Sequence, residues 1–259
     1  MPKVFIKNRK NQKICVLVEE KKNPRGLVFV MHGLGSFKES ATVKSRSDVF
    51  SEANFTVVRF DTTNTLGESD GCYEKATTTN YYQDLEDVIG WSKKQTWYIE
   101  PFVLIGSSLG GFCVAYYAEK HTNEVKALTL VAPVVSGRFR VEAHKKYDLE
   151  KFKLWRKTGW FVRESVSKPG VTLKLPWSHM VDGLKYNLLP RVNKLTMPVL
   201  IIVGEKDEST PVYQVRKLYK LLPGQKELHI IKGAPHVFRT KKYLNQTQSI
   251  LKKWIGKVL

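Results

Sequence analysis

Apolar residues in this chain occur in short blocks, separated by longer stretches in which they recur with helical spacing. Mostly apolar blocks are typical of strands covered on both faces of a sheet, and they predict strands at 26–31, 55–60, 102–105, 125–131, 199–203 and 228–231. Helical spacing predicts helices at 40–52, 77–94, 110–119, 211–222 and 241–258. The first part of the chain has a different pattern. Two short apolar segments at 4–6 and 14–18, joined by a polar turn, predict a pair of antiparallel strands.

The order of these elements predicts an α/β fold. Strands that alternate with helices form a mostly parallel sheet with helices on both faces. The alternation stops at 134–196, a basic, aromatic and turn-rich segment, and resumes after it. We therefore expect a core formed by residues 1–133 and 197–259, with residues 134–196 inserted into it.

A candidate nucleophile lies in the segment Gly106-Ser107-Ser108-Leu109-Gly110, between a predicted strand and the helix after it. A Gly-x-Ser-x-Gly sequence in that position is typical of a nucleophile elbow. Such a sharp turn needs small residues two positions before and after the serine, here Gly106 and Gly110. It exposes the Ser108 hydroxyl and directs the N-terminus of the helix toward the reaction centre. Ser107, one position away, is the alternative nucleophile.

A serine nucleophile needs a base, and the base needs a carboxylate that orients it. Asp207 follows the predicted strand 199–203, and sites in open parallel sheets lie beyond the carboxyl ends of strands. A helix N-cap is the alternative role for this aspartate. His236 lies in a loop of small residues after the last strand and is the best placed of the six histidines. The order Ser108, Asp207, His236 is that of the α/β-hydrolases.

The loop His32-Gly33-Leu34-Gly35 follows the first long apolar strand. Its small residues would let backbone amides approach the reaction centre. We expect the N–H groups of Leu34 and Leu109 to bind the oxyanion of a tetrahedral intermediate, because fixed donors need no reorganisation during the reaction. A bare turn is the alternative reading of this loop, and its position directly after the strand favours the oxyanion role.

With these motifs in this order, the chain resembles the serine hydrolases of the α/β-hydrolase superfamily over essentially its whole length. It is most similar to small bacterial cinnamoyl/feruloyl esterases and the related monoacylglycerol-lipase-like and serine-aminopeptidase-like group. Residues 60–71 resemble a family loop in which an aspartate precedes Gly-His-Gly and a serine, although here the Gly-His-Gly is absent and the loop is one residue longer. The resemblance implies that residues 134–196 form a small cap over the active site, where substrate choice is made.

The inserted segment is rich in aromatic and basic side chains. Trp160, Trp177 and Tyr186 are candidates for binding an aryl or acyl group, and packing of the insertion onto the core is their alternative role. The arginines and lysines of the segment would favour acidic substrates if they faced the site. Otherwise they belong to a solvated surface.

The composition adds one unusual property, a net charge of +19 from 43 Lys and Arg against 24 Asp and Glu. Such a charge attracts polyanions, but the basic residues are scattered along the chain, so we expect no specific nucleic-acid partner. No apolar run approaches the ~20 residues of a membrane helix, and the chain does not begin with a signal-peptide pattern. Together with three widely spaced cysteines, these features predict a cytoplasmic protein without disulfides.

The motifs together predict a serine esterase that acts through an acyl-enzyme on small-molecule substrates, short-chain or aryl esters of the cinnamoyl or feruloyl type. A thioesterase, an acyltransferase, a monoacylglycerol lipase or a proline-type aminopeptidase would use the same three residues. A non-catalytic binding protein on a hydrolase scaffold is the alternative from another class. No zinc, dinucleotide or P-loop motif is present, so we expect no cofactor. The sequence leaves both monomer and homodimer open.

Overall fold

The structure is a computed structural model that describes residues 3–259. Its strands are β1 Lys3–Lys7, β2 Lys13–Glu19, β3 Leu27–Met31, β4 Thr56–Phe60, β5 Phe102–Ser107, β6 Val125–Val131, β7 Trp160–Glu164, β8 Thr172–Pro176, β9 Val199–Gly204 and β10 Lys226–Ile231. Its α-helices are α1 Ala41–Glu52, α2 Thr78–Ser92, α3 Leu109–Lys120, α4 Gly137–Tyr147, α5 Leu149–Thr158, α6 Trp177–Gly183, α7 Val212–Leu221 and α8 Lys241–Val258. Two 3-10 helices are η1 Tyr73–Lys75 and η2 Leu189–Lys194.

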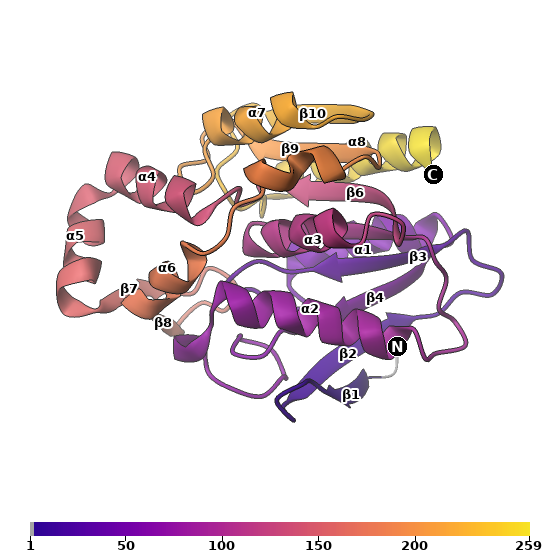
Figure 1. The fold of residues 1–259 in the computed structure, drawn as a ribbon, viewed down its shortest axis with the longest axis horizontal. Helices are drawn as coiled ribbons and strands as arrows, with labels where there is room; N and C mark the ends of the chain where they lie inside the picture. Colours follow the sequence, from indigo (N-terminus) through magenta and orange to yellow (C-terminus); the bar gives the residue numbers. More distant parts are fainter. Residues whose placement is uncertain (1–2) are drawn as a thin grey trace.

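The main sheet has the strand order β1-β2-β4-β3-β5-β6-β9-β10 among the described residues. β2 is antiparallel to β1 and to β4, whereas the neighbouring pairs from β4 to β10 are parallel. The carboxyl ends of β3, β5, β6 and β9 therefore lie along the same edge of the sheet, on the left in Figure 1. This arrangement confirms the prediction of a mostly parallel sheet with an antiparallel start.

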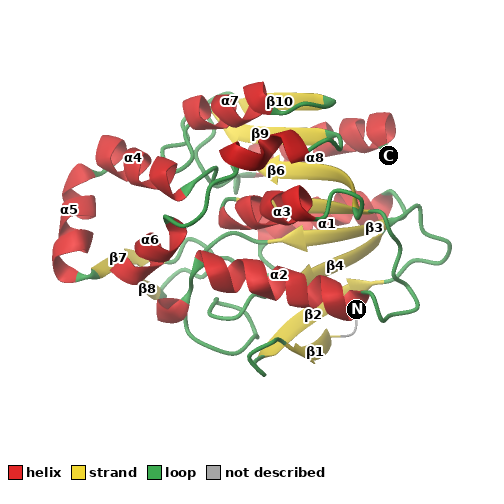
Figure 2. Ribbon diagram, viewed as in Figure 1, coloured by secondary structure: helices red, strands yellow, loops and turns green. Residues whose placement is uncertain are grey.

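Helices cover both faces of the sheet, as the alternating pattern predicts (Figure 2). On one face, α1 and α8 pack against each other and contribute Phe50 and Trp254 to a buried cluster. On the other face, α2, α3 and α7 contribute Leu85, Phe112 and Leu218 to a second buried cluster. Because β3, β4 and β9 are buried along their whole length, they hold the loops that follow them in a fixed geometry.

Residues 134–196 contain α4, α5, α6, η2 and the separate antiparallel pair β7–β8. In Figure 1 α4, α5, α6, β7 and β8 lie beyond the edge of the sheet at which the parallel strands end. Asp182 fastens this segment to α2, because its carboxylate accepts hydrogen bonds from the Thr79 amide and hydroxyl, at 2.9 and 2.7 Å. His179 adds a bond from Nδ1 to the Ala76 carbonyl, at 2.8 Å. The segment is thus held over the end of the sheet.

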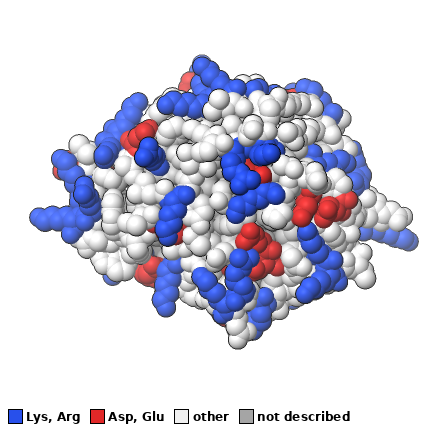
Figure 3. Space-filling model, viewed as in Figure 1, with Lys and Arg blue, Asp and Glu red and all other residues white. Residues whose placement is uncertain are grey.

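The surface carries the excess of positive charge in a dispersed form. Figure 3 shows Lys and Arg spread over the visible face, with Asp and Glu among them. Within residues 3–259, no helix is both long and apolar enough to cross a membrane.

Candidate active site at the carboxyl edge of the sheet

Ser108 occupies the sharp turn between β5 and α3, with φ 52° and ψ −117°. Such a backbone conformation is costly for a residue with a Cβ atom. The turn also brings its flanks close together, because a Cβ on Gly106 would lie 2.4 Å from the Gly110 carbonyl oxygen. A Cβ on Gly110 would in turn lie 2.2 Å from the His32 carbonyl oxygen. Both glycines are therefore required by close backbone approach, which is the steric reason for the motif.

Ser108, His236 and Asp207 are connected by two hydrogen bonds. The Ser108 Oγ lies 3.0 Å from His236 Nε2, and His236 Nδ1 lies 2.8 Å from Asp207 Oδ2. A carboxylate can only accept, so Nδ1 carries the proton and leaves Nε2 free to accept from the Ser108 hydroxyl. The structure brings together the three residues that the sequence selects, and it fixes the imidazole tautomer that a general base needs.

Asp207 is 3% exposed and accepts several hydrogen bonds. Its Oδ1 accepts from the amides of Ser209 and Thr210, at 2.9 and 2.8 Å, and its Oδ2 accepts from the Thr210 hydroxyl at 2.9 Å. Burial alone would raise the pKa of Asp207, but its electrostatic interaction and hydrogen bond with His236 and the bonds from Thr210 hold that pKa below its ordinary value. The aspartate is therefore ionised at neutral pH. It does not cap α7, whose N-cap residue is Pro211.

Two neighbouring acidic residues have other surroundings. Glu205 is exposed, and its Oε2 accepts a bond from the Gly233 amide at 2.8 Å, which fastens the loop that carries His236. Glu208 is also exposed. The alternative nucleophile, Ser107, is the last residue of β5, and the hydrogen bond to His236 Nε2 comes from Ser108.

His32 is fully buried beneath the loop that follows β3 and shapes it. Its Nδ1 donates to the Gly33 carbonyl at 2.9 Å, and its Nε2 accepts from the Thr62 amide at 3.1 Å. Burial lowers the pKa of this histidine, which therefore stays neutral with its proton on Nδ1. A Cβ on Gly33 would lie 3.1 Å from the Cβ of Ser108. The loop is thus held against the nucleophile elbow.

Leu34 directly follows Gly33 in the chain, and Leu109 directly follows Ser108. Both residues line the cavity that Ser108 and His236 also line. Within residues 3–259 neither amide donates to a protein acceptor. Their N–H groups are therefore available to a ligand, as the oxyanion prediction requires. Gly35, with φ +75°, turns the chain just after Leu34.

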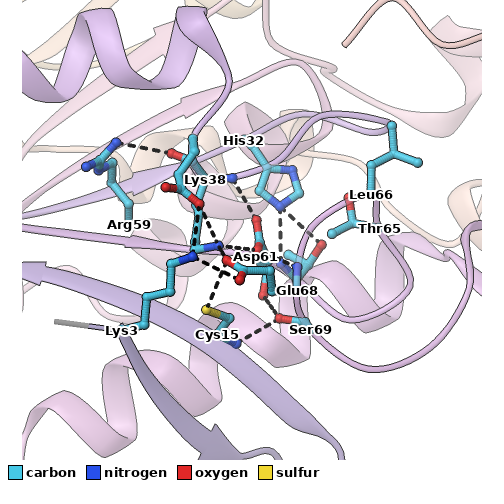
Figure 4. A network of polar contacts seen from close by, with 12 residues as sticks. Lys3, Cys15, His32, Lys38, Arg59, Asp61, Thr65, Leu66, Glu68 and Ser69 are labelled. Carbon is cyan, nitrogen blue, oxygen red and sulfur yellow. Dashed lines mark hydrogen bonds and ion pairs between the residues drawn. The ribbon is translucent and has the colours of Figure 1, made fainter. Parts of the chain in front are cut away.

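A buried ion pair that the motifs did not predict supports this loop (Figure 4). Lys38 is 1% exposed, and its Nζ lies 2.9 Å from Asp61 Oδ2 and also bonds to Glu68. Asp61 Oδ1 accepts from the Lys38 amide at 2.7 Å. Hydrogen bonds from Lys38 and Lys3 lower the pKa of Glu68 to about 2. The pair joins the loop after β3 to the loop after β4.

The same place holds a set of potential metal ligands. One atom each of Cys15, Asp61 and Glu68 lies within 4.8 Å of the others. However, the ammonium of Lys38 binds both carboxylates, so a cation already occupies the position that a metal ion would take. Burial also raises the pKa of the Cys15 thiol, which disfavours the thiolate that binds metals. We interpret the cluster as structural.

The cavity at Ser108 has a volume of about 330 Å³. Aromatic rings on its wall come from Tyr73, Tyr147, Trp155 and Phe161. The segment 134–196 contributes the last three of these rings, together with Leu175. An apolar group of a substrate would therefore contact both the sheet edge and the inserted segment.

The aromatic residues that the sequence selected lie elsewhere. Trp160 is 45% exposed, and Trp177 packs with its ring 5.4 Å from that of Trp155. Tyr186 packs against Phe112 and bonds through its hydroxyl to Thr79. None of the three predicted residues is on the cavity wall, within the part of the chain that the structure describes. The aromatic content of the segment was visible in the sequence, but the direction of each ring depends on how the insertion folds.

Comparisons with known proteins agree with this architecture. A family model described as serine aminopeptidase, S33 (Hydrolase_4) matches residues 22–240. The palmitoyl-protein thioesterase ABHD10, mitochondrial, of Mus musculus is 25% identical over 198 residues, which cover 72% of this chain and 60% of that protein.

Two solved structures have a similar fold. Est1E from Butyrivibrio proteoclasticus with bound ferulic acid has a TM-score of 0.80 at 20% identity, with 98% of each chain covered. Alpha/beta hydrolase domain-containing protein 10 from mouse has a TM-score of 0.79 at 19% identity, with 100% of each chain covered. These similarities confirm the predicted α/β-hydrolase fold.

Proposed function

Because the chain belongs to the serine aminopeptidase S33 family of α/β-hydrolases, we propose that it is an esterase with Ser108 as its nucleophile. In this proposal His236 is the general base and Asp207 orients it. The observation that carries the proposal is the continuous pair of hydrogen bonds, 2.8 and 3.0 Å long, from Asp207 through His236 to Ser108. The last of these residues lines an open cavity.

The proposed reaction follows from this geometry. The Ser108 Oγ attacks the ester carbonyl carbon while His236 Nε2 takes its proton. The negative charge that develops on the carbonyl oxygen is bound by the amides of Leu34 and Leu109. His236 then protonates the leaving alcohol, which leaves an acyl group on Ser108. Water, deprotonated by His236, hydrolyses this acyl-enzyme and releases the acid.

The proposed substrates are short-chain or aryl esters, and residues 134–196 are proposed to act as the cap that selects them. The aromatic rings of Trp155 and Phe161 on the cavity wall support this choice. A thioesterase is the second candidate, because a thioester has the same carbonyl chemistry and a relative of this chain is named as a thioesterase. An aminopeptidase would need carboxylates for the substrate's amino group, and the cavity has more arginines than acidic residues on its wall.

The proposal is tested with purified protein and 4-nitrophenyl acetate and butyrate. We expect hydrolysis by the wild type, loss of hydrolysis in Ser108→Ala, and retention in the neighbouring control Ser107→Ala. A fluorophosphonate probe should label the wild type and Ser107→Ala but not Ser108→Ala. Hydrolysis at the wild-type rate by Ser108→Ala would contradict the assignment of the nucleophile. Absence of both hydrolysis and labelling in the wild type would favour the binding-protein alternative.

A further inference from the structure

The wall of the Ser108 cavity carries an excess of arginine. Four arginines from four separate parts of the chain line it: Arg46 in α1, Arg140 in α4, Arg163 in β7 and Arg239 before α8. The acidic residues on the wall are Asp148 and Glu208. The Asp148 carboxylate lies 3.0 Å from the ammonium of Lys151, and Glu208 is exposed. The acidic residues therefore leave the arginine charge of the cavity largely uncompensated.

Arg46 is the most unusual of these arginines because it is 5% exposed. Its Nε has no hydrogen-bond partner, and within residues 3–259 no carboxylate lies within 4.0 Å of its guanidinium. Burial lowers the pKa of Arg46 to about 10, so the group remains charged at neutral pH. A buried charge without a counter-ion is strongly unfavourable. An anion bound in the cavity would supply that counter-ion.

Arg140 has a neutral partner. Its guanidinium lies 3.0 Å from His179 Nε2, and this histidine donates through Nδ1 to a backbone carbonyl. Burial and the charge of Arg140 lower the pKa of His179 to about 3, so the imidazole is uncharged. Burial likewise lowers the pKa of His144, on the same cavity wall, to about 4. The charge of Arg140 is thus solvated by a neutral ring and not paired with a negative group.

Arg163 lies beside the loop that carries the proposed oxyanion donor. Its Nη2 is 3.0 Å from the position that a Cβ on Gly35 would take. Within the described chain no carboxylate lies within 4.0 Å of this guanidinium. Arg163 comes from the inserted segment and Arg46 from the core, so both parts of the chain contribute arginines to the cavity wall.

We propose that the physiological substrate is an ester that carries a carboxylate in addition to the ester bond, and that Arg46, Arg140 and Arg163 bind this carboxylate. This inference rests on the proposed esterase function and specifies its substrate class. The planar guanidinium donates two parallel hydrogen bonds to a carboxylate, which makes arginine well suited to this group. The aromatic rings on the same wall would contact the apolar part that joins the carboxylate to the ester.

The test compares two substrates of nearly the same shape. One is the mono-4-nitrophenyl ester of adipic acid, which carries a free carboxylate, and the other has a neutral primary amide in place of that carboxylate. We expect the wild type to have a kcat/KM for the carboxylate ester at least tenfold above that for the amide, since a charge-assisted hydrogen bond is strong in a buried site (about tenfold or more). A ratio of one or below would overturn the proposal.

Variants then locate the source of the preference. Arg140→Gln and Arg163→Gln should each reduce the carboxylate-to-amide ratio about fivefold to tenfold, as expected for the loss of one charged hydrogen bond. Arg138→Gln is the matched control, because Arg138 is an exposed residue of α4 off the cavity wall. It removes the same unit of charge, so an equal effect of Arg138→Gln would assign the preference to the overall charge of +19 and overturn the proposal. Arg140→Lys should restore part of the ratio.

Binding to Ser108→Ala separates this inference from the proposed function. Isothermal titration of this variant with the two compounds measures recognition without hydrolysis. If the wild type hydrolyses the neutral amide ester but shows no preference for the carboxylate, the function holds and the inference fails. If neither compound is hydrolysed but the variant binds the carboxylate compound at least tenfold more tightly than the amide, the inference holds and the function fails. A phosphonate in place of the carboxylate that binds more tightly still would overturn the assignment to a carboxylate.

Discussion

Replacing Asp207 with asparagine changes one atom of the proposed catalytic unit and tests its most specific feature. The asparagine oxygen can keep the bonds from the Ser209 and Thr210 amides, which lie 2.9 and 2.8 Å from Asp207 Oδ1. Its NH₂ group would then face His236 Nδ1, 2.8 Å away. Because that NH₂ donates, Nδ1 must accept and the ring proton moves to Nε2. The imidazole can then no longer take the proton of Ser108.

The expected loss is large in rate and small in stability. The equivalent substitution in a serine protease lowers kcat by ~10⁴, which is about 5.5 kcal/mol in activation free energy. We expect a loss of at least 10²-fold here, as judged by that precedent. Most of the hydrogen bonds of the loop remain, so the free energy of unfolding should fall by less than about 2 kcal/mol. The assay is kcat/KM with one activated 4-nitrophenyl ester, together with urea denaturation of the same preparations.

Two neighbouring glutamates provide matched controls. Glu205→Gln keeps an oxygen that can accept from the Gly233 amide, and Glu208 is exposed. Each glutamine variant should therefore keep its kcat/KM within about tenfold of the wild type, since neither side chain orients the imidazole in the proposed mechanism. Near-normal turnover in Asp207→Asn, together with a collapse in either glutamine variant, would refute the assignment of the acid.

Three further predictions concern backbone packing and buried charges. Gly110→Ala should abolish activity and lower stability, because its Cβ would lie 2.2 Å from a backbone oxygen. Gly90→Ala, which has open space around it in α2, should raise the free energy of unfolding by about 0.5–1 kcal/mol. Equal denaturation midpoints for the two variants would contradict this contrast. Lys38→Met should destabilise the protein by about 3–5 kcal/mol, because it leaves Asp61 buried without its cation. Denaturant titration measures the loss. A change below about 1 kcal/mol would mean that the ion pair does not stabilise the fold. Burial raises the pKa of Glu119 from 4.5 to about 8. Between these pH values the folded state keeps the proton while the unfolded state releases it, so the folded state loses stability as the pH rises from about 4.5 to about 8. Glu119→Gln should therefore gain thermal stability relative to the wild type across that interval, and a difference in Tm that does not change with pH would contradict it.

The sequence predicted the parts of the fold whose signal is local. Continuous apolar blocks such as 199–203 are typical of strands covered on both faces, so a mostly parallel sheet followed from their alternation with helices. The order of the strands in that sheet was not predicted. The positions of Ser108, Asp207 and His236 followed from the same alternation, because parallel strands end at one edge. The small elements of the insertion have short and mixed patterns, and 160–164 and 172–176 could not be recognised as a paired hairpin.

Other parts of the site depend on contacts between distant residues. Thr210 bonds to Asp207 through its hydroxyl, but threonine in a polar loop gives no signal of that role. Lys38 and Asp61 pair only after β3 and β4 lie side by side. The burial of Arg46 could have been inferred from the sequence, because it lies three residues after Val43 and therefore falls on the buried face of α1. An arginine on an apolar helical face is the pattern that could have revealed it.

The backbone conformation of Ser108 has a consequence for how this protein would evolve. With φ at 52°, position 108 is one at which glycine is intrinsically more favourable than serine. Mutation to glycine would relieve that strain, yet it would also remove the hydroxyl on which the proposed chemistry depends. Selection for catalysis and selection for stability therefore act in opposite directions at this codon. In a lineage that no longer needed the reaction, we expect glycine to replace serine at this position. A glycine at position 108 in a related sequence would then indicate that the activity has been lost.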